Sequence, residues 1–205
     1  MDYRQKLEET IKSLTCANKL FLHSCCAVCS SFVLEYLSHF VPITVYYYNP
    51  NIFPEAEYNK RKSEQIRLIN TTDYANPVDI IDGDYDHSEF VSRIAGLENC
   101  DEGGERCAKC FEQRLEKTAR FAKKHGYDYF ATTLTISPHK DADVINSIGK
   151  KLSAKHQVEW LYSDFKKKDG FQKTMKIAKS KGIYIQNYCG CEFSYKKGEK
   201  NEKNF

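Results

Sequence analysis

Cysteine is the residue type whose number and spacing in this sequence could carry chemistry. Seven of the nine cysteines fall into three short clusters, which are Cys25-Cys26-x-x-Cys29, Cys107-x-x-Cys110 and Cys189-x-Cys191. A single CxxC pair is weak evidence, because zinc sites, redox dithiols and chance all produce it. Three clusters in one chain are more specific and favour a redox metal centre. We expect the other two, Cys16 and Cys100, to be small buried hydrophobic side chains.

The number of clustered thiols bears on the identity of the metal. A structural zinc site normally takes four ligands in a closed tetrahedron, and seven thiols, two of them adjacent in the chain, exceed that need. Iron–sulfur clusters bind four thiolates, which are soft ligands. We therefore expect an iron–sulfur centre, with three thiols left for a second metal or a redox-active pair. Which four thiols bind the cluster stays open.

Composition indicates the compartment in which these thiols work. The chain has 205 residues, of which 41% are hydrophobic and 29% charged, as is typical of soluble globular proteins. No segment approaches the roughly 18 apolar residues of a membrane span, and the first residues are too polar for a signal peptide. We expect a cytoplasmic protein with no membrane partner, and cytosolic cysteines more often bind metal than form disulfides.

Charge is unevenly distributed along the chain. Residues 1–100 carry 9 basic and 14 acidic side chains, whereas residues 101–205 carry 22 basic and 14 acidic ones. A basic half suggests a polyanionic partner, of which nucleic acid is the commonest. Solvated helix faces explain the same counts equally well.

The clusters must be positioned by an alternation of strands and helices. Apolar and β-branched runs predict strands at 19–23, 43–48, 78–81, 129–134 and 160–161. Amphipathic or charged helical patterns predict helices at 3–14, 30–40, 55–69, 88–97, 106–125, 141–155 and 170–181. This alternation is typical of an α/β fold with a mainly parallel sheet.

Two clusters have a definite place in this pattern. Cys25-Cys26-x-x-Cys29 follows the first strand, where nucleotide-binding α/β proteins carry a glycine-rich phosphate loop. The following helix directs its positive end at these thiols and favours thiolate. Cys107 and Cys110 lie on one face of a helix start and should point inward.

We expect one α/β catalytic domain over residues 19–194, because no repeat or linker interrupts it. A helical extension over residues 1–18 precedes it. A polar tail over residues 195–205 follows, and we expect it to be disordered.

Five segments resemble the signature of the QueH-type epoxyqueuosine reductases, namely residues 23–30, 102–111, 132–140, 163–168 and 188–191. The resemblance implies a Rossmann-like (HUP-type) three-layer domain, related to the nucleotide α-hydrolases, with helices on both faces of the sheet. It implies a [4Fe-4S] cluster and an additional iron ion. It also implies the last step of queuosine biosynthesis, which is the reduction of epoxyqueuosine to queuosine at the wobble position of a tRNA anticodon. The low-potential electron donor is not identified.

Such a reaction needs proton donors and a grip on single-stranded RNA. His139 and Asp164 are candidate catalytic residues because each follows a predicted strand in a loop. The alternative for His139 is a surface or capping histidine. The alternative for Asp164 is an N-cap or the partner of a nearby lysine. Basic and aromatic side chains bind single-stranded RNA, and the candidates for substrate binding are Lys140, Phe165, Lys166 and Tyr188.

Two other function classes stay open from the sequence. An ATP-dependent PP-loop tRNA-modifying enzyme would need a phosphate loop after the first strand, where this chain has cysteines. A zinc-stabilised RNA-binding module would fit the basic half of the chain, and metal analysis distinguishes it from the reductase.

Overall fold

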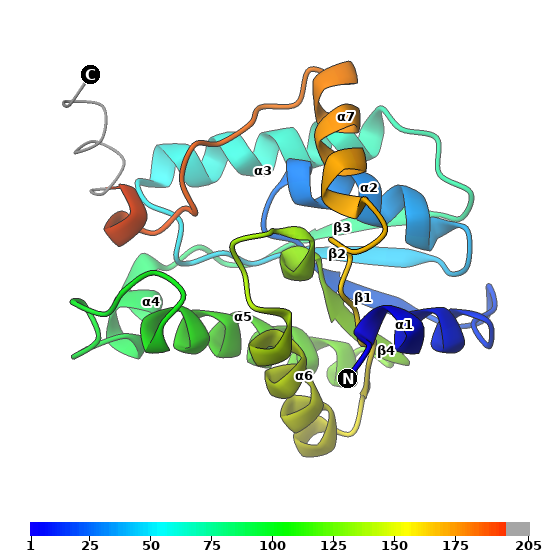
Figure 1. Ribbon diagram of the computed structural model, residues 1–205, viewed down its shortest axis with the longest axis horizontal. Coiled ribbons are helices and arrows are strands. Elements are labelled where there is room, and N and C mark those ends of the chain that lie inside the picture. Colours follow the sequence, from blue (N-terminus) through cyan, green and yellow to red (C-terminus); the bar gives the residue numbers. More distant parts are fainter. Residues whose placement is uncertain (196–205) are drawn as a thin grey trace.

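Five parallel strands form a single sheet in the computed structural model, which describes residues 1–195 (Figure 1). The order is β3-β2-β1-β4-β5. The bounds are β1 Leu20–His23, β2 Ile43–Tyr47, β3 Val78–Asp82, β4 Tyr129–Thr132 and β5 Glu159–Trp160. All four residues of β1 are buried, as expected of a central strand covered on both faces. The predicted α/β class with a parallel sheet is confirmed.

Helices cover both faces of the sheet and make three layers (Figure 1). One outer layer contains α2 (Ala27–Ser38), with α3 (Glu55–Asn70) and α7 (Gly170–Ser180) packed against it. The other contains α5 (Glu105–Lys124) and α6 (Ala142–His156), and α4 (His87–Arg93) packs on α5. None of the helices within residues 1–195 combines the length and apolar character needed to span a membrane.

The N-terminal helix α1 (Tyr3–Ile11) packs against the same hydrophobic cluster as the sheet. Leu7 and Ile11 are its buried residues. Its acidic side chains reach the loop after β5, where Asp2 pairs with Lys167 at 3.4 Å and Glu8 with Lys168 at 2.6 Å. Of the tail expected over 195–205, residues 196–205 lie outside the described part of the chain.

Two predicted boundaries were wrong at functionally relevant places. Helix α2 begins at Ala27 rather than near Ser30, because Cys26 is its N-cap and its sulfur accepts a hydrogen bond from the Cys29 amide at 3.4 Å. The strand expected over 129–134 ends at Thr132, whose hydroxyl accepts from the Leu134 amide at 3.2 Å and starts the 3-10 helix η1 (Thr133–Ile136). Both caps turn the chain just beyond the sheet.

A buried histidine fixes the carboxyl ends of three strands relative to one another. His23, at the end of β1, is fully buried, and its Nε2 donates to the Tyr48 carbonyl at 3.1 Å. Because that carbonyl can only accept, Nδ1 is the acceptor and receives the Thr132 hydroxyl at 2.9 Å. Burial, with the nearby charge of Arg114, lowers the pKa of His23 to about 3, so the ring is neutral.

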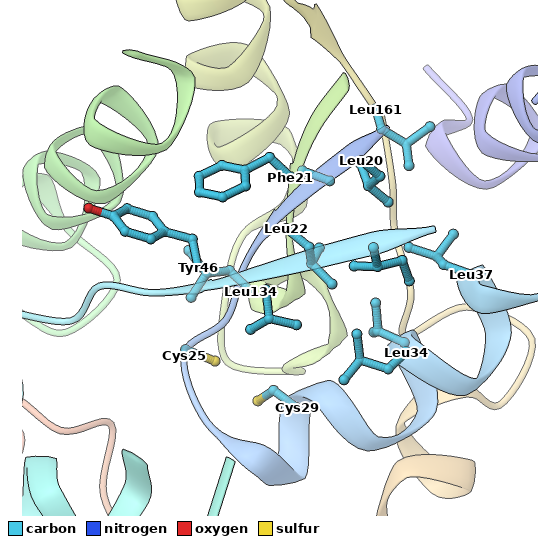
Figure 2. Close-up of a cluster of buried hydrophobic side chains, with 14 of the residues drawn as sticks. Leu20, Phe21, Leu22, Cys25, Cys29, Leu34, Leu37, Tyr46, Leu134 and Leu161 are labelled. Atoms are coloured by element: carbon cyan, nitrogen blue, oxygen red, sulfur yellow. The ribbon is translucent and has the colours of Figure 1, made fainter. Parts of the chain in front are cut away.

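The core extends to the first cysteine cluster. Figure 2 shows leucines of β1 and α2 packed with Leu134 and Leu161, and Cys25 and Cys29 lie at one end of this cluster with their sulfurs directed toward each other. The thiols are therefore continuous with a rigid apolar core.

Close packing of α6 on β5 gives a test of the fold. A Cβ at Gly149 would lie 2.2 Å from the indole ring of Trp160, a buried side chain whose Nε1 donates to Asn146 at 3.0 Å. Overpacking costs about 1–3 kcal/mol and outweighs the roughly 1 kcal/mol that alanine gains in a helix. We expect Gly149→Ala to lower the free energy of unfolding by about 1–2 kcal/mol in urea titrations. Lys150→Ala, at the exposed neighbouring position, should change it by less than about 0.5 kcal/mol. Equal or greater stability of Gly149→Ala would contradict this packing.

Candidate metal centre

A cavity of about 650 Å³ lies at the carboxyl edge of the sheet. Its residues follow the ends of β1, β2 and β4, and others come from the start of α5 and from the segment after α7. The strand order reverses between β1 and β4, and ligands of open α/β sheets bind at such a switch point. Five of the residues that line it are cysteines, namely Cys25, Cys26, Cys29, Cys107 and Cys189.

The first cluster is already assembled for binding. The sulfurs of Cys25, Cys26 and Cys29 lie within 4.8 Å of one another, and all three residues are buried. Thr133, at the end of β4, contacts the Cys25 sulfur through its hydroxyl at 3.5 Å. The N-terminus of α2 directs its positive end at the same place. In a PP-loop enzyme a phosphate loop occupies this turn. In this chain the three cysteines occupy the turn instead.

Hydrogen bonds among the three thiols favour the loss of a proton at Cys25 over the other two. Hydrogen bonds from Cys26 and Cys29 hold the pKa of Cys25 well below its ordinary value. The same contacts raise the pKa of Cys26 to about 11 and that of Cys29 well above its usual range. A group of this kind releases further protons when a metal cation takes their place.

The other four clustered cysteines come from α5 and from the segment after α7. Cys107 and Cys189 are half-buried, whereas Cys110 and Cys191 are buried against Phe90. Burial raises the pKa of Cys110 to about 12, with contributions from the charges of Cys189, Cys191 and Cys107. These four thiols are thus electrostatic neighbours, although within residues 1–195 they do not form a second group with all sulfurs inside 4.8 Å.

The third cluster is held in place by a buried arginine that the sequence did not single out. Arg61 of α3 pairs with Glu57 at 2.7 Å. Its guanidinium also donates to the carbonyls of Tyr188 and Cys189, both at 3.3 Å. Between the two cysteines of this cluster, Gly190 has a φ of +124°, a conformation that strongly favours glycine. The sequence signal was available, since Arg61 lies on the same face of α3 as the buried Tyr58, Gln65 and Leu68.

Gln186 links the third cluster to the first. Its Nε2 donates to the Cys26 sulfur at 3.0 Å, across 160 positions in the chain. The segment after α7 therefore lies against the β1–α2 turn, and thiols from both ends of the sequence meet at one cavity.

Two cations face these thiols. Lys140, predicted as a substrate-binding residue, is half-buried and lines the cavity. Burial alone would lower its pKa, but the thiolates of Cys189, Cys25 and Cys29 raise it above the ordinary lysine value. Arg114 of α5 is 2% exposed and also lines the cavity.

The candidate catalytic residues lie at the boundary of a second, smaller cavity. His139 is exposed and lines both cavities. Asp164 is buried, lines only the smaller cavity and pairs with Lys166 at 3.0 Å. The segment 138–141 forms a wall common to both cavities, and of the two candidates only His139 belongs to it.

The two aromatic residues predicted to bind the substrate, Tyr188 and Phe165, differ in exposure. Tyr188 lines the larger cavity and lies over the Arg61 guanidinium at 4.9 Å. Phe165 is fully buried in the main hydrophobic cluster and has no surface on which a base could stack.

Cys16 is exposed, so its predicted burial was wrong, and Cys100 is half-buried. Cys16 lies in the turn after α1, which contributes few apolar contacts.

Known proteins resemble this chain over most of its length. A protein-family model described as epoxyqueuosine reductase QueH matches residues 20–197. The epoxyqueuosine reductases QueH of Streptococcus pyogenes and Haemophilus influenzae are each 41% identical to it. The first comparison covers 86% of this chain and 70% of the relative, and the second 89% and 74%. The corresponding protein of Thermotoga maritima is 34% identical, over 85% of this chain and 89% of its own length. With its cysteine-lined cavity inside the matched segment, this oxidoreductase belongs to the QueH family of epoxyqueuosine reductases.

Proposed function

We propose that this chain reduces the epoxide of epoxyqueuosine in the anticodon of a tRNA to the alkene of queuosine. The observation that carries the proposal is the set of buried sulfurs of Cys25, Cys26 and Cys29, gathered at the switch-point cavity. Removal of the epoxide oxygen as water consumes two electrons and two protons. Thiols at this density, in a chain of this family, favour a redox metal centre as the site that receives the electrons.

The donor set fits an iron–sulfur centre. Five of the seven thiols, from all three segments, line one cavity, and soft thiolates suit iron–sulfur clusters. We propose that a [4Fe-4S] cluster and an additional iron ion are held by ligands from this set: Cys25, Cys26, Cys29, Cys107, Cys110, Cys189 and Cys191. Such a centre supplies electrons and a Lewis acid for the epoxide oxygen. An external low-potential donor, a reductant not yet identified, renews the electrons.

The protein supplies protons and orientation around this centre. Asp164 and His139 are the proposed proton donors, because His139 lies on the wall between the two cavities and Asp164 lines the smaller one. The ion pair between Asp164 and Lys166 fixes the carboxylate. Lys140 and Tyr188, both at the cavity, are proposed to bind the nucleotide, with Lys166 at the rim of the smaller cavity.

Metal content and reductase activity distinguish the proposed reductase from the alternative, a zinc-stabilised RNA-binding module. The direct test is anaerobic incubation of the reconstituted protein with epoxyqueuosine-containing tRNA and a low-potential reductant, followed by nucleoside mass spectrometry. We expect queuosine to appear in proportion to the iron content of the protein. Cys107→Ser should lose most of its iron and activity while its far-UV circular dichroism is unchanged, because Cys107 lines the cavity and is only half-buried.

Cys16→Ser is the matched control, since Cys16 is exposed and lies outside the cavity. It should keep the iron and the activity of the unmodified chain. A colourless protein that takes up zinc but no iron under anaerobic reconstitution would reject the iron–sulfur centre and favour the RNA-binding module.

A second test concerns the proton donors. Asp164→Asn keeps the size of the side chain but removes the acid, and general acid catalysis contributes about 10²–10⁴ in rate. We expect turnover to fall by about that factor with iron content retained. His139→Gln, measured in parallel, shows which of the two residues supplies the proton. Asp79→Asn, an exposed carboxylate on β3, should leave turnover unchanged. Full activity of Asp164→Asn would remove it from the mechanism, and loss of iron would make it a ligand or a structural residue instead.

A further inference from the structure

Arg114 carries a buried charge that has no carboxylate partner in the described part of the chain, although its guanidinium lies over the Phe111 ring at 5.6 Å. Its side chain is 2% exposed, and Nε donates to the Cys110 carbonyl at 3.1 Å. Nη2 is buried without a hydrogen-bond partner. Throughout residues 1–195, no carboxylate oxygen lies within 4.0 Å of the guanidinium.

The other two buried arginines each have several acceptors, although Arg106 also lacks a carboxylate partner within residues 1–195 and its Nε is unpartnered. Arg61 has Glu57 at 2.7 Å and two carbonyl acceptors. Arg106 donates to the carbonyls of Leu97, Glu98 and Cys100 at the start of α5. Arg114 alone among these three has neither an acidic partner nor several carbonyl acceptors, so its environment in this chain is incomplete.

An unpaired buried cation is expensive. Removing an ion from water costs several kcal/mol even after the protein relaxes, and an arginine cannot escape this cost by losing its proton. The position is therefore favourable only when an anion lies beside it. Because Arg114 lines the cavity, that anion can come from the cavity rather than from the fold.

The neighbouring thiols indicate which anion this is. The charge of Arg114 acts on Cys110, Cys189, Cys25 and Cys107, which represent all three cysteine clusters. One helical turn separates it from Cys110, so that both side chains lie on the buried face of α5. A centre built from thiolates of all three clusters would lie next to this guanidinium.

We propose that Arg114 is the counter-cation of the metal–thiolate centre and that it raises the reduction potential of this centre. The inference rests on the proposed function. A fixed positive charge in a medium of low dielectric favours the state with the additional electron. Hydrogen bonds to cluster sulfurs act in the same direction, and the unpartnered Nη2 is available to donate one. Arg114 is a positioning and electrostatic residue that need not touch the substrate.

The test compares reduction potentials of reconstituted variants, measured by redox titration with electron paramagnetic resonance. Arg114→Met removes the charge and keeps an apolar stem of similar reach. We expect its potential to fall by an amount equivalent to about a tenfold change in the reduction equilibrium, which is about 59 mV for a one-electron couple. Arg114→Lys restores a charge without the planar fork and should recover part of the shift. Arg120→Met, an exposed arginine on the same helix, should leave the potential unchanged.

A second readout follows the metal itself. With less compensation of its negative charge, the centre of Arg114→Met should release iron to a chelator faster than that of the unmodified chain or of Arg120→Met. Arg114→Gln is the second variant, should methionine impair folding. If neither Arg114→Met nor Arg114→Gln folds without metal, the residue serves the fold, and the inference is overturned.

The outcomes separate this inference from the proposed function. An unmodified chain that forms a cluster and reduces the tRNA, but whose Arg114→Met variant has the same potential, overturns the inference and leaves the function standing. An unmodified chain that binds no iron rejects the proposed centre and the inference together. A lowered potential in Arg114→Met, with partial recovery in Arg114→Lys, supports both.

Discussion

Thiols that bind metal must give up their protons, and negative charges repel one another strongly where water is scarce. The arrangement around the cavity answers this constraint. The helix dipole of α2, Lys140 and Arg114 place positive charge around the sulfurs from three directions. Without these groups, bringing five thiols to one cavity would favour protonated cysteines that bind metal poorly. The sheet topology and the packing of the helices serve to keep these charges in position.

The need for positive charge beside the sulfurs also explains how the first cysteine cluster can occupy the place of a phosphate loop. A phosphate loop binds an anion with backbone amides at a helix N-terminus. Here Cys25 stands at this place, and hydrogen bonds from Cys26 and Cys29 hold its pKa well below the ordinary value, while the helix that follows directs its positive end at the same sulfurs. Cys26 also serves as the N-cap of α2, so one side chain both begins the helix and joins the sulfur group. The chemistry of the turn changes while its electrostatics are retained.

Sequence patterns predicted the sheet, the helices and the three cysteine clusters, because each depends on local periodicity or on spacing in the chain. The inward direction of Cys110 also followed from its place on α5. The contacts of Arg61 and Gln186 could not be predicted in this way, since they join segments more than 70 positions apart. The surroundings of Arg114 could not be predicted either, because they depend on thiols from distant parts of the chain. Charged residues on a helix are normally assigned to its solvent face, and both arginines depart from that rule. Phe165 departs from the prediction in the opposite sense. An aromatic residue in a basic loop predicts an RNA contact, but this side chain is buried in the core.

The link between Gln186 and Cys26 has a consequence for folding. Cys25 and Cys189 line one cavity, so a metal centre that includes both would close a loop of most of the chain. In chain-entropy terms, closing a loop longer than 100 residues restricts the unfolded state by roughly 5 kcal/mol, as a disulfide of that span would. A cofactor in this position would act as a reversible cross-link between the two ends of the polypeptide. Loss of the cofactor would then lower the stability of the whole protein, so that an unfolding measurement would report whether the cofactor is bound.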